Sequence, residues 1–269
     1  MGFSVVSNVA SANAQANMEM TQVGLNKALN RLASGFRINY SGDDSAGLAV
    51  ANSYRNTIAI LNQGIRNAND GLSVLQIKDG ALANISTLLD RMATLATQAA
   101  SSGANGVDIS KLSDEFNTLT SEIDREAAVG GMTAAAGFSV FVSAESTSSN
   151  GKITATSIGA TQTSDLGITQ TSFTSVAQAQ TALSQVKAAV STLGGVQNTI
   201  GTLENRISFA ISLSQSQVVN TKAAEGRIRD ANVAEESANM TRFNILTQSG
   251  IAALAQANQS TSAVLSLLR

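Results

Sequence analysis

A heptad pattern of apolar residues in the first half of the chain predicts a long helix. Apolar residues recur every seven positions from Leu61 to Ala96, with a second apolar row beside them. The second row changes sides near Asp79, which is the drift expected when a helix with 3.6 residues per turn carries a 3.5-residue repeat. The turn-like Asn69-Asp70-Gly71 does not interrupt the repeat. We therefore predict one continuous helix over residues 45–100, long enough for a coiled coil or a rod.

Two further segments have helical spacing and are predicted to pack against this helix. After a loop at Ser101–Gly106, a shorter helix has the apolar face Ile109, Leu112, Phe116, Leu119 and Ile123. A second long helix repeats apolar residues at Val186, Leu193, Ile200 and Ile207. Gly194, Gly195 and Gly201 each weaken that helix by up to ~1 kcal/mol relative to Ala, and we expect them to allow close helix approach. Antiparallel packing of the three helices predicts a long bundle.

A short region between the helices predicts a β-hairpin. Phe138–Val142 partly alternates between apolar and polar residues, and Asn150-Gly151 is a turn signal before Lys152–Ile158. Residues Gly159–Thr174 have no clear periodicity, so we expect an exposed loop there.

The two ends of the chain carry weakly amphipathic helical patterns with almost no charge. Residues Met1–Asn26 contain one charged side chain, Glu19, and Phe243–Leu268 contains none. A surface helix normally has charged residues on its outer face, so we expect these outer faces to meet protein. Neither helix should be stable alone, because most helical stability comes from packing one face. We predict that the two pair with each other and then with further copies of the chain.

The segment between the first two helices reads as an ordered connector. Residues 31–47 contain three Gly and several helix-stopping residues, and they lead to a helix N-cap at Asp43 or Asp44. Two adjacent carboxylates could also suggest a metal or acid–base site. Without His or a third ligand, capping is by far the more frequent role of such a pair.

Composition narrows the class of function. The 269 residues carry a net charge of −2 and include no Cys, His or Pro. Thiol nucleophiles, imidazole bases, disulfides and nearly every zinc site are thereby removed, and the charge does not favour nucleic acid. We expect no enzyme and no cofactor. Met1–Ala16 has neither the basic start nor the long apolar core of a secretory signal.

Several motifs occur together and in order at the two ends of the chain. They are Leu29–Asn39, Asp43–Ala51, Arg66–Gly71, Asn205-Arg206, Arg227-Ile228, Leu254–Asn258 and Val264–Arg269. With these motifs the sequence resembles bacterial flagellin, the subunit of the flagellar filament. The middle departs from many flagellins, because Ala135-Ala136-Gly137 stands where they have Phe-Asn-Gly, and the variable segment is very short. The chain resembles a minimal flagellin.

Together, pattern and resemblance predict a mainly α fold: a long antiparallel helical coiled-coil or bundle rod, paired terminal helices and a small β-hairpin. The expected domains are inner-core terminal helices at residues 1–40 with 230–269, a helical rod at 41–134 with 172–229, and a hairpin with a surface loop at 135–171.

The resemblance implies a structural subunit that is exported unfolded and polymerises into the filament for swimming motility, its end helices folding on assembly. Implied partners are identical subunits, the flagellar type III export apparatus, the filament cap and hook-junction proteins, and a chaperone that holds Arg227–Arg269. The subunit would be secreted into the extracellular filament, without membrane insertion or nucleic-acid binding.

The resemblance and the apolar pattern also select candidate residues. The expected assembly core is Leu25, Leu29, Leu32, Ile251, Leu254, Leu265, Leu268 and Arg269. The expected connector residues are Arg31, Gly35, Arg37, Asn39, Asp43 and Asp44. The resemblance further implies a contact with a vertebrate Toll-like receptor through Arg91, Leu95 and Glu115. The alternative role of these three is packing between subunits.

Three alternative functions remain open from the sequence alone. A flagellin-like junction or cap protein would share the end segments but would not grow long filaments from seeds. A secreted helical translocator would insert into host membranes, and the polar content of Phe243–Leu268 argues against it. An enzyme would need an active site built without Cys or His, and no cluster of suitable residues lies outside the helix faces.

Overall fold

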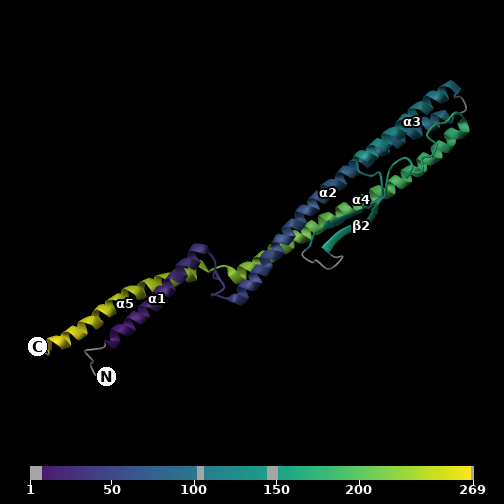
Figure 1. Ribbon diagram of the computed structural model, residues 1–269. Helices are drawn as coiled ribbons and strands as arrows, with labels where there is room; N and C mark the ends of the chain where they lie inside the picture. The colour runs from purple at the N-terminus through teal and green to yellow at the C-terminus, as the bar shows by residue number, and fades with distance from the viewer. Residues whose placement is uncertain (1–7, 102–105, 144–150, 268–269) are drawn as a thin grey trace. The chain divides into compact units, whose positions relative to one another are not determined.

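The computed structural model describes residues 8–101, 106–143 and 151–267, and within these it contains five helices and a β-hairpin (Figure 1). The elements are α1 (Val9–Ser34), α2 (Ser45–Ala99), α3 (Gly106–Val129), β1 (Ala136–Phe141), β2 (Lys152–Ile158), α4 (Val176–Arg229) and α5 (Val233–Leu267). This arrangement confirms the predicted mainly α fold with paired terminal helices and a small hairpin.

The chain divides into two compact units. Residues 1–56 with 220–269 form the terminal unit, and residues 57–219 form the central unit. Helices α2 and α4 contribute residues to both. The central unit holds the main apolar core, and the terminal unit holds the paired end helices.

Helix α2 is the uninterrupted helix that the heptads predict. The turn-like triplet ends in Gly71, whose surroundings explain its presence inside a helix. A Cβ at Gly71 would lie 2.6 Å from the Cγ2 atom of Val140 on β1. A Cβ at Gly64, one heptad earlier, would collide with the backbone oxygen of Val142. The two glycines let the hairpin lie directly on the helix, and they do not mark a turn.

Helices α2, α3 and α4 bury the faces that their spacing predicts. Their fully buried residues include Leu75, Leu82, Leu89, Phe116, Ile123, Val186, Leu193, Ile200 and Ile207. Figure 1 shows the three helices running beside one another in this unit. Burial of continuous apolar rows is the dominant favourable contribution to folding, so the central unit has a core of its own.

The expectation that glycines on α4 permit close helix approach is wrong for the contacts within this chain. A Cβ added at Gly194, Gly195 or Gly201 would meet no described atom within 4 Å. These glycines lie beside the buried heptad positions Leu193 and Ile200, not on them. Their helix-weakening effect is therefore not compensated by packing inside the chain.

The predicted hairpin is confirmed. Strands β1 and β2 pair antiparallel, with Ser139 opposite Thr154 and an irregular register between Ala136 and Phe138. The Nδ2 atom of Asn67 on α2 donates a hydrogen bond to the backbone oxygen of Phe141 at 3.4 Å. Most of the hairpin's loop lies outside the described residues.

The segment after the hairpin is not the exposed loop that we expect from the sequence. It buries Thr161, Thr163, Leu166, Ile168 and Phe173. Polar side chains of α3 and α4 accept hydrogen bonds from its irregular backbone, so this segment can lie against the core without leaving those N–H groups unpaired. Residues without periodicity can therefore be core residues here.

Two contacts with α3 illustrate how this segment is held. The backbone N–H and the hydroxyl of Thr163 both donate to Asp124 Oδ1 at 2.8 Å. The N–H of Phe173 donates to the Ser113 hydroxyl at 2.9 Å. The Phe173 ring meets the Phe116 ring edge to face, with centroids 5.3 Å apart, a favoured aromatic geometry.

We predict that Phe173→Ala destabilises the central unit by about 3–5 kcal/mol, because it empties a buried aromatic site. Phe209→Ala is the matched control, since this ring is 75% exposed and its loss should change stability by only about 0.5 kcal/mol. Urea denaturation of both variants measures the difference. Equal destabilisation by the two substitutions would contradict the burial of Phe173.

We predict that Gly201→Ala stabilises the central unit by up to ~1 kcal/mol through helix propensity, because the added methyl group has open space. Gly64→Ala should destabilise it, since the new Cβ would strike the Val142 backbone. Thermal unfolding of both variants distinguishes the two glycine environments. A loss of stability in Gly201→Ala would show that this position is packed after all.

Candidate assembly site

The two terminal helices pair antiparallel in the terminal unit. The Asn8 Nδ2 atom donates to the Ala257 backbone oxygen at 3.0 Å. A Cβ at Gly24 would lie 2.6 Å from the Phe243 ring, so the ring lies directly against the α1 backbone. Because residue 8 meets residue 257 and residue 24 meets residue 243, the helices run in opposite directions. The structure confirms that the helices at the two ends of the chain are partners (Figure 1).

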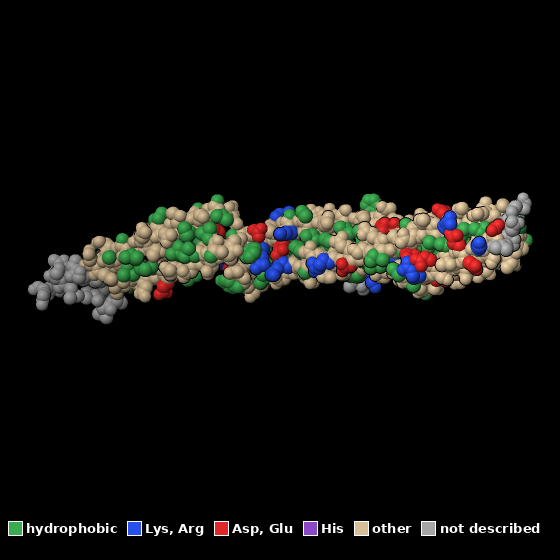
Figure 2. Space-filling view, turned by 90° about the horizontal axis from the view of Figure 1, so that it is seen from above, with side chains coloured by type: hydrophobic (Ala, Val, Ile, Leu, Met, Phe, Trp, Pro, Cys, Tyr) green, Lys and Arg blue, Asp and Glu red, His purple; other side chains and the backbone are tan. Residues whose placement is uncertain are grey.

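This pair leaves most of its apolar side chains exposed. Ala28 is the one buried residue of α1, and Glu236 is the one buried residue among the described side chains of α5. Large apolar residues are 44–68% exposed on these helices: Val9, Met20, Val23, Leu29, Val233, Ile245, Leu246 and Ile251. Figure 2 shows apolar side chains exposed on the face of the molecule that it draws. So many exposed apolar residues on one helix pair indicate a protein-binding surface.

The expected assembly-core residues lie on this pair. Leu29 and Ile251 are exposed, whereas Leu25, Leu32 and Leu254 are half-buried. The five residues therefore lie on one helix pair, and part of their apolar surface remains exposed to solvent. Outside the described side chains lie Leu265, Leu268 and Arg269.

The groove between α1 and α5 is neutral. Its lining includes the amides of Asn13 and Asn17, the hydroxyl groups of Thr21 and Ser249, and the apolar Leu246, with no charged residue. A partner in this groove would need small apolar and neutral polar groups. The terminal helices themselves have that composition.

The connector begins where α1 ends at a glycine cap. Gly35 has a φ of 73°, a left-handed conformation that favours glycine. Its N–H donates to the Arg31 backbone oxygen at 2.9 Å, and its own oxygen accepts from the Ala231 N–H at 2.9 Å. Phe36 then forms an antiparallel bridge with Asp230. The segment after α1 is thereby joined to the segment between α4 and α5.

Two arginines reinforce this junction. The Arg37 N–H donates to the Arg229 backbone oxygen at 2.6 Å, and Arg37 Nη2 donates to the Ile228 backbone oxygen at 2.9 Å. The Arg229 guanidinium lies 4.1 Å from the centroid of the Phe36 ring, within the range of a cation–π contact. Both connecting segments are therefore fixed to each other in the terminal unit.

The adjacent aspartates have separate roles. Asp44 Oδ1 accepts from the Gly47 N–H at 2.9 Å and caps α2, which confirms the predicted cap. Asp43 Oδ1 pairs with Lys27 Nζ at 2.9 Å, and Asp43 Oδ2 accepts from the Asn39 N–H at 3.2 Å. Burial raises the pKa of Asp43, but the hydrogen bonds from Lys27 and Asn39 outweigh it and hold that pKa below its usual value. Asp43 thus ties α1 to the connector.

A partly buried ion pair links α1 to α5 at the same junction. Arg31 Nη1 lies 2.8 Å from Glu236 Oε1, and Glu236 is only 7% exposed. Asn232 precedes Glu236 and caps α5 by accepting from the Ala234 N–H at 3.1 Å.

All six predicted connector residues therefore lie at one junction. The sequence pattern does not identify four further residues that join this junction, which are Lys27, Phe36, Arg229 and Glu236. A capping Asn followed by acidic residues in the first helical turn was the available signal for Glu236.

The three residues of the implied receptor contact lie in the central unit. Arg91 Nε and Nη2 both donate to Glu115 Oε1, at 2.9 and 2.6 Å, and both side chains are about half exposed. Leu95 is only 1% exposed. The structure brings Arg91 and Glu115 together on the surface and places Leu95 in the core.

Residues 8–101, 106–143 and 151–267 show neither a metal site nor a membrane span. No group of three or more acidic residues that could hold a metal ion occurs among them. No helix in the described part of the chain is both long and apolar enough to span a bilayer.

Comparison with known proteins finds matches at both ends of the chain. The bacterial flagellin N-terminal helical region matches residues 5–139, and the bacterial flagellin C-terminal helical region matches residues 176–268. A flagellin of Halalkalibacterium halodurans is 33% identical over 276 residues, covering 97% of this chain and 98% of that protein. The flagellin FlaB1 of Treponema pallidum is 31% identical over 283 residues, with the same coverage of 97% and 98%.

Among solved structures, a Bacillus cereus flagellin is 29% identical with a TM-score of 0.48, covering 60% of this chain and 94% of that one. The matches at both ends and the overlap along nearly the whole of two flagellins identify the chain. The chain belongs to the bacterial flagellin family, whose members are structural proteins and not enzymes, and it is a subunit of the extracellular flagellar filament, which is built from identical subunits and serves motility.

Proposed function

We propose that this filament subunit is exported unfolded and that its terminal helices fold only as it joins the filament. The supporting observation is the contrast between the two units. Rows of apolar residues are buried in the central unit, whereas α1 buries Ala28 alone. The terminal pair therefore depends on neighbouring subunits for most of the burial that stabilises it.

The energetics of the terminal pair support coupled folding and assembly. Ordering each residue costs about 1–2 kcal/mol of backbone entropy, and little apolar burial within the chain offsets that cost. Binding to neighbouring subunits would shift the equilibrium toward the folded pair, because they bind the folded form alone. In such an assembly, each subunit would use one surface to cover its neighbour and a different surface to be covered itself. Contacts between two different surfaces can continue into an open helical array.

The composition supports export of an unfolded chain. The sequence has no Pro and no Cys, so neither proline isomerisation nor disulfide formation would delay refolding at the growing end. The proposed partners before and during secretion are the flagellar type III apparatus and a chaperone that holds Arg227–Arg269. At the two ends of the filament, the partners would be the cap and hook-junction proteins.

We further propose roles for the predicted domains. Residues 1–40 with 230–269 would form the inner core, residues 41–134 with 172–229 the rod, and residues 135–171 a short hairpin region on the rod. The assembly-core leucines and isoleucine would pack against neighbouring subunits. The six connector residues would hold the start of α2 and the end of α4 against the folded terminal pair, through the bonds of Gly35, Arg37 and Asp43 described above.

Recognition by a vertebrate Toll-like receptor is a second proposal. The exposed Arg91–Glu115 pair favours it, because its charges are accessible to a protein partner. Leu95, on the buried face of α2, would act indirectly by holding that part of the helix against the core. Arg91 and Glu115 would then make the direct contacts.

We predict that Ile251→Asp abolishes filament growth, because it places a charge on an apolar surface that neighbouring subunits would cover. Ile251 is 57% exposed, so the central unit should keep its unfolding midpoint. Ile251→Leu is the matched control and should assemble. Sedimentation and negative-stain electron microscopy provide the readout, and normal filaments from Ile251→Asp would refute the proposed role of α5.

We predict that Arg31→Ala destabilises the filament by about 3–5 kcal/mol per subunit, because it leaves the buried Glu236 carboxylate without its partner. Adding Glu236→Leu should recover most of this loss, since no buried charge remains. Disassembly midpoints in urea for the wild type, both single variants and the double variant complete the cycle. Additive effects of the two substitutions would mean that the pair is not coupled in the filament.

A further inference from the structure

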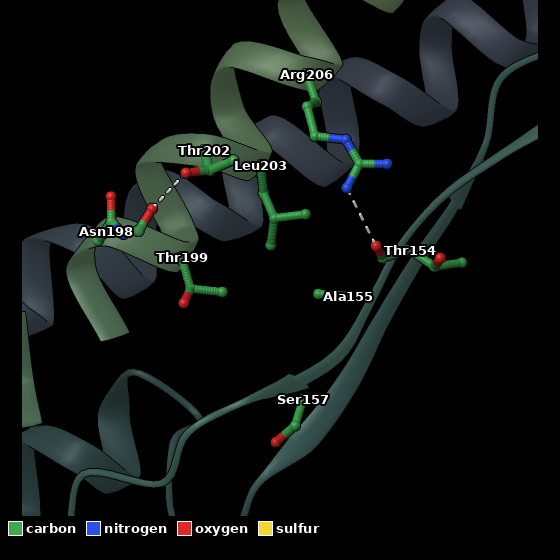
Figure 3. A pocket seen from close by; sticks show the side chains of 8 residues that line it. All are labelled: Thr154, Ala155, Ser157, Asn198, Thr199, Thr202, Leu203 and Arg206. Atoms are coloured by element: carbon green, nitrogen blue, oxygen red, sulfur yellow. Dashed lines mark hydrogen bonds between the residues drawn. The ribbon is translucent and has the colours of Figure 1, made fainter. Parts of the chain in front are cut away.

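A polar groove with one positive charge lies between α4 and β2 in the central unit. Figure 3 shows its lining, which includes Thr199 and Thr202 from α4 and Thr154 and Ser157 from β2. Arg206 is the one charged residue among the eight residues that line it. A ligand of this groove would meet hydroxyl groups and a guanidinium, so it should carry a negative charge.

The Arg206 guanidinium has more N–H donors than its described hydrogen bond uses. Its Nη1 atom donates to the Thr154 backbone oxygen at 3.5 Å, the outer limit for a hydrogen bond. Across the part of the chain that the structure describes, no ion pair involves Arg206. Because a guanidinium has five N–H donors and pairs well with carboxylates, an acidic side chain is the partner that fits.

An exposed apolar stripe continues from this groove along α4. Phe209 and Leu213 follow Arg206 at spacings of three and seven residues, which places all three on one face of the helix. Phe209 is 75% exposed and Leu213 is 60% exposed. A large exposed aromatic residue beside an arginine is typical of residues that dominate protein interfaces. The occupant should therefore present apolar side chains next to its carboxylate.

Helix α2 of a second copy of this chain would present a carboxylate beside exposed apolar side chains. Asp70, Val74 and Ile77 are spaced by four and three residues, so they also share one helix face. Val74 is 47% exposed and Ile77 is 61% exposed, and Asp70 is also exposed. Among the described residues no ion pair involves Asp70. This face matches the α4 stripe in both charge and apolar character.

We propose that the α4 face Arg206–Phe209–Leu213 of one subunit binds the α2 face Asp70–Val74–Ile77 of a second copy. The proposal rests on the filament function and adds a contact between central units to it. Within the described residues neither Asp70 nor Arg206 has an ion-pair partner, so the two charges could pair across subunits. Because the two faces differ, each copy would offer one face and bind the other, and a contact of this kind can continue from subunit to subunit along an open filament.

Charge reversal tests this contact. Arg206→Glu and Asp70→Arg should each raise the critical concentration for elongation from seeds at least about tenfold, because close interface charge pairs are strongly coupled. The double variant, which exchanges the charges, should recover most of the wild-type value. Lys187→Glu is the matched control, since it reverses another exposed charge on α4 and should leave the critical concentration unchanged.

Phe209→Ala gives a second test that does not alter charge. Its side chain is exposed, so the free subunit should keep its unfolding midpoint while its critical concentration rises severalfold. Sedimentation of seeded reactions measures both series of variants, and circular dichroism monitors folding of the free subunits. A folded Phe209→Ala subunit that elongates like the wild type would overturn the contact.

The outcomes separate this contact from the filament function. If the wild type did not elongate at all, both would fall together. If the wild type and Arg206→Glu elongated equally, the contact would be wrong while the filament function stood. Failure of Asp70→Arg to rescue Arg206→Glu, or rescue by Glu19→Arg instead, would overturn the assignment of the α2 face.

Discussion

The shortage of apolar burial in the terminal helix pair is the constraint on which the rest of the structure depends. Helices of 26 and 35 residues pair along their length, yet most of their large apolar side chains remain exposed. Hydrophobic burial is the main favourable contribution to folding, so this pair needs surfaces that one chain does not supply. Other subunits of the filament are the natural source of those surfaces.

The connector shows how such a pair can be positioned without a core of its own. Polar contacts dominate there: a glycine cap, a backbone bridge, the Arg229–Phe36 contact and the Arg31–Glu236 ion pair. Directional bonds of this kind specify a geometry while contributing modest net stability. The connector therefore fixes where α1 ends and α5 begins. In the proposed assembly, packing between subunits would provide most of the free energy that keeps these helices folded.

Heptad spacing was enough to predict the long helices, because buried positions on a helix repeat in the sequence. The row from Leu61 to Ala96 and the row from Val186 to Ile207 became the core of the central unit. The paired end helices were predictable from composition and not from a strong repeat, since their lack of charge indicated surfaces that meet protein.

Other features depend on contacts that leave no local pattern. Phe173 is held in the core by a hydrogen bond from its N–H to Ser113 and by ring contact with Phe116, both on α3. Nothing near residue 173 in the sequence indicates these contacts. The sequence predicts close packing at Gly194, Gly195 and Gly201 of α4, yet in the chain they face open space. Glu236 was missed because its partner Arg31 lies 205 residues away. Spacing along one helix does not identify a side chain's partner on another.

Hydrogen exchange measured by mass spectrometry on the free subunit and on the filament tests the central claim most directly. Amides of α1 and α5 should exchange rapidly in the free subunit and become strongly protected in the filament. Amides in the buried part of α2, around Leu82 and Leu89, should be protected in both states and serve as the internal reference. Equal protection of α1, α5 and this part of α2 in the free subunit would contradict folding on assembly.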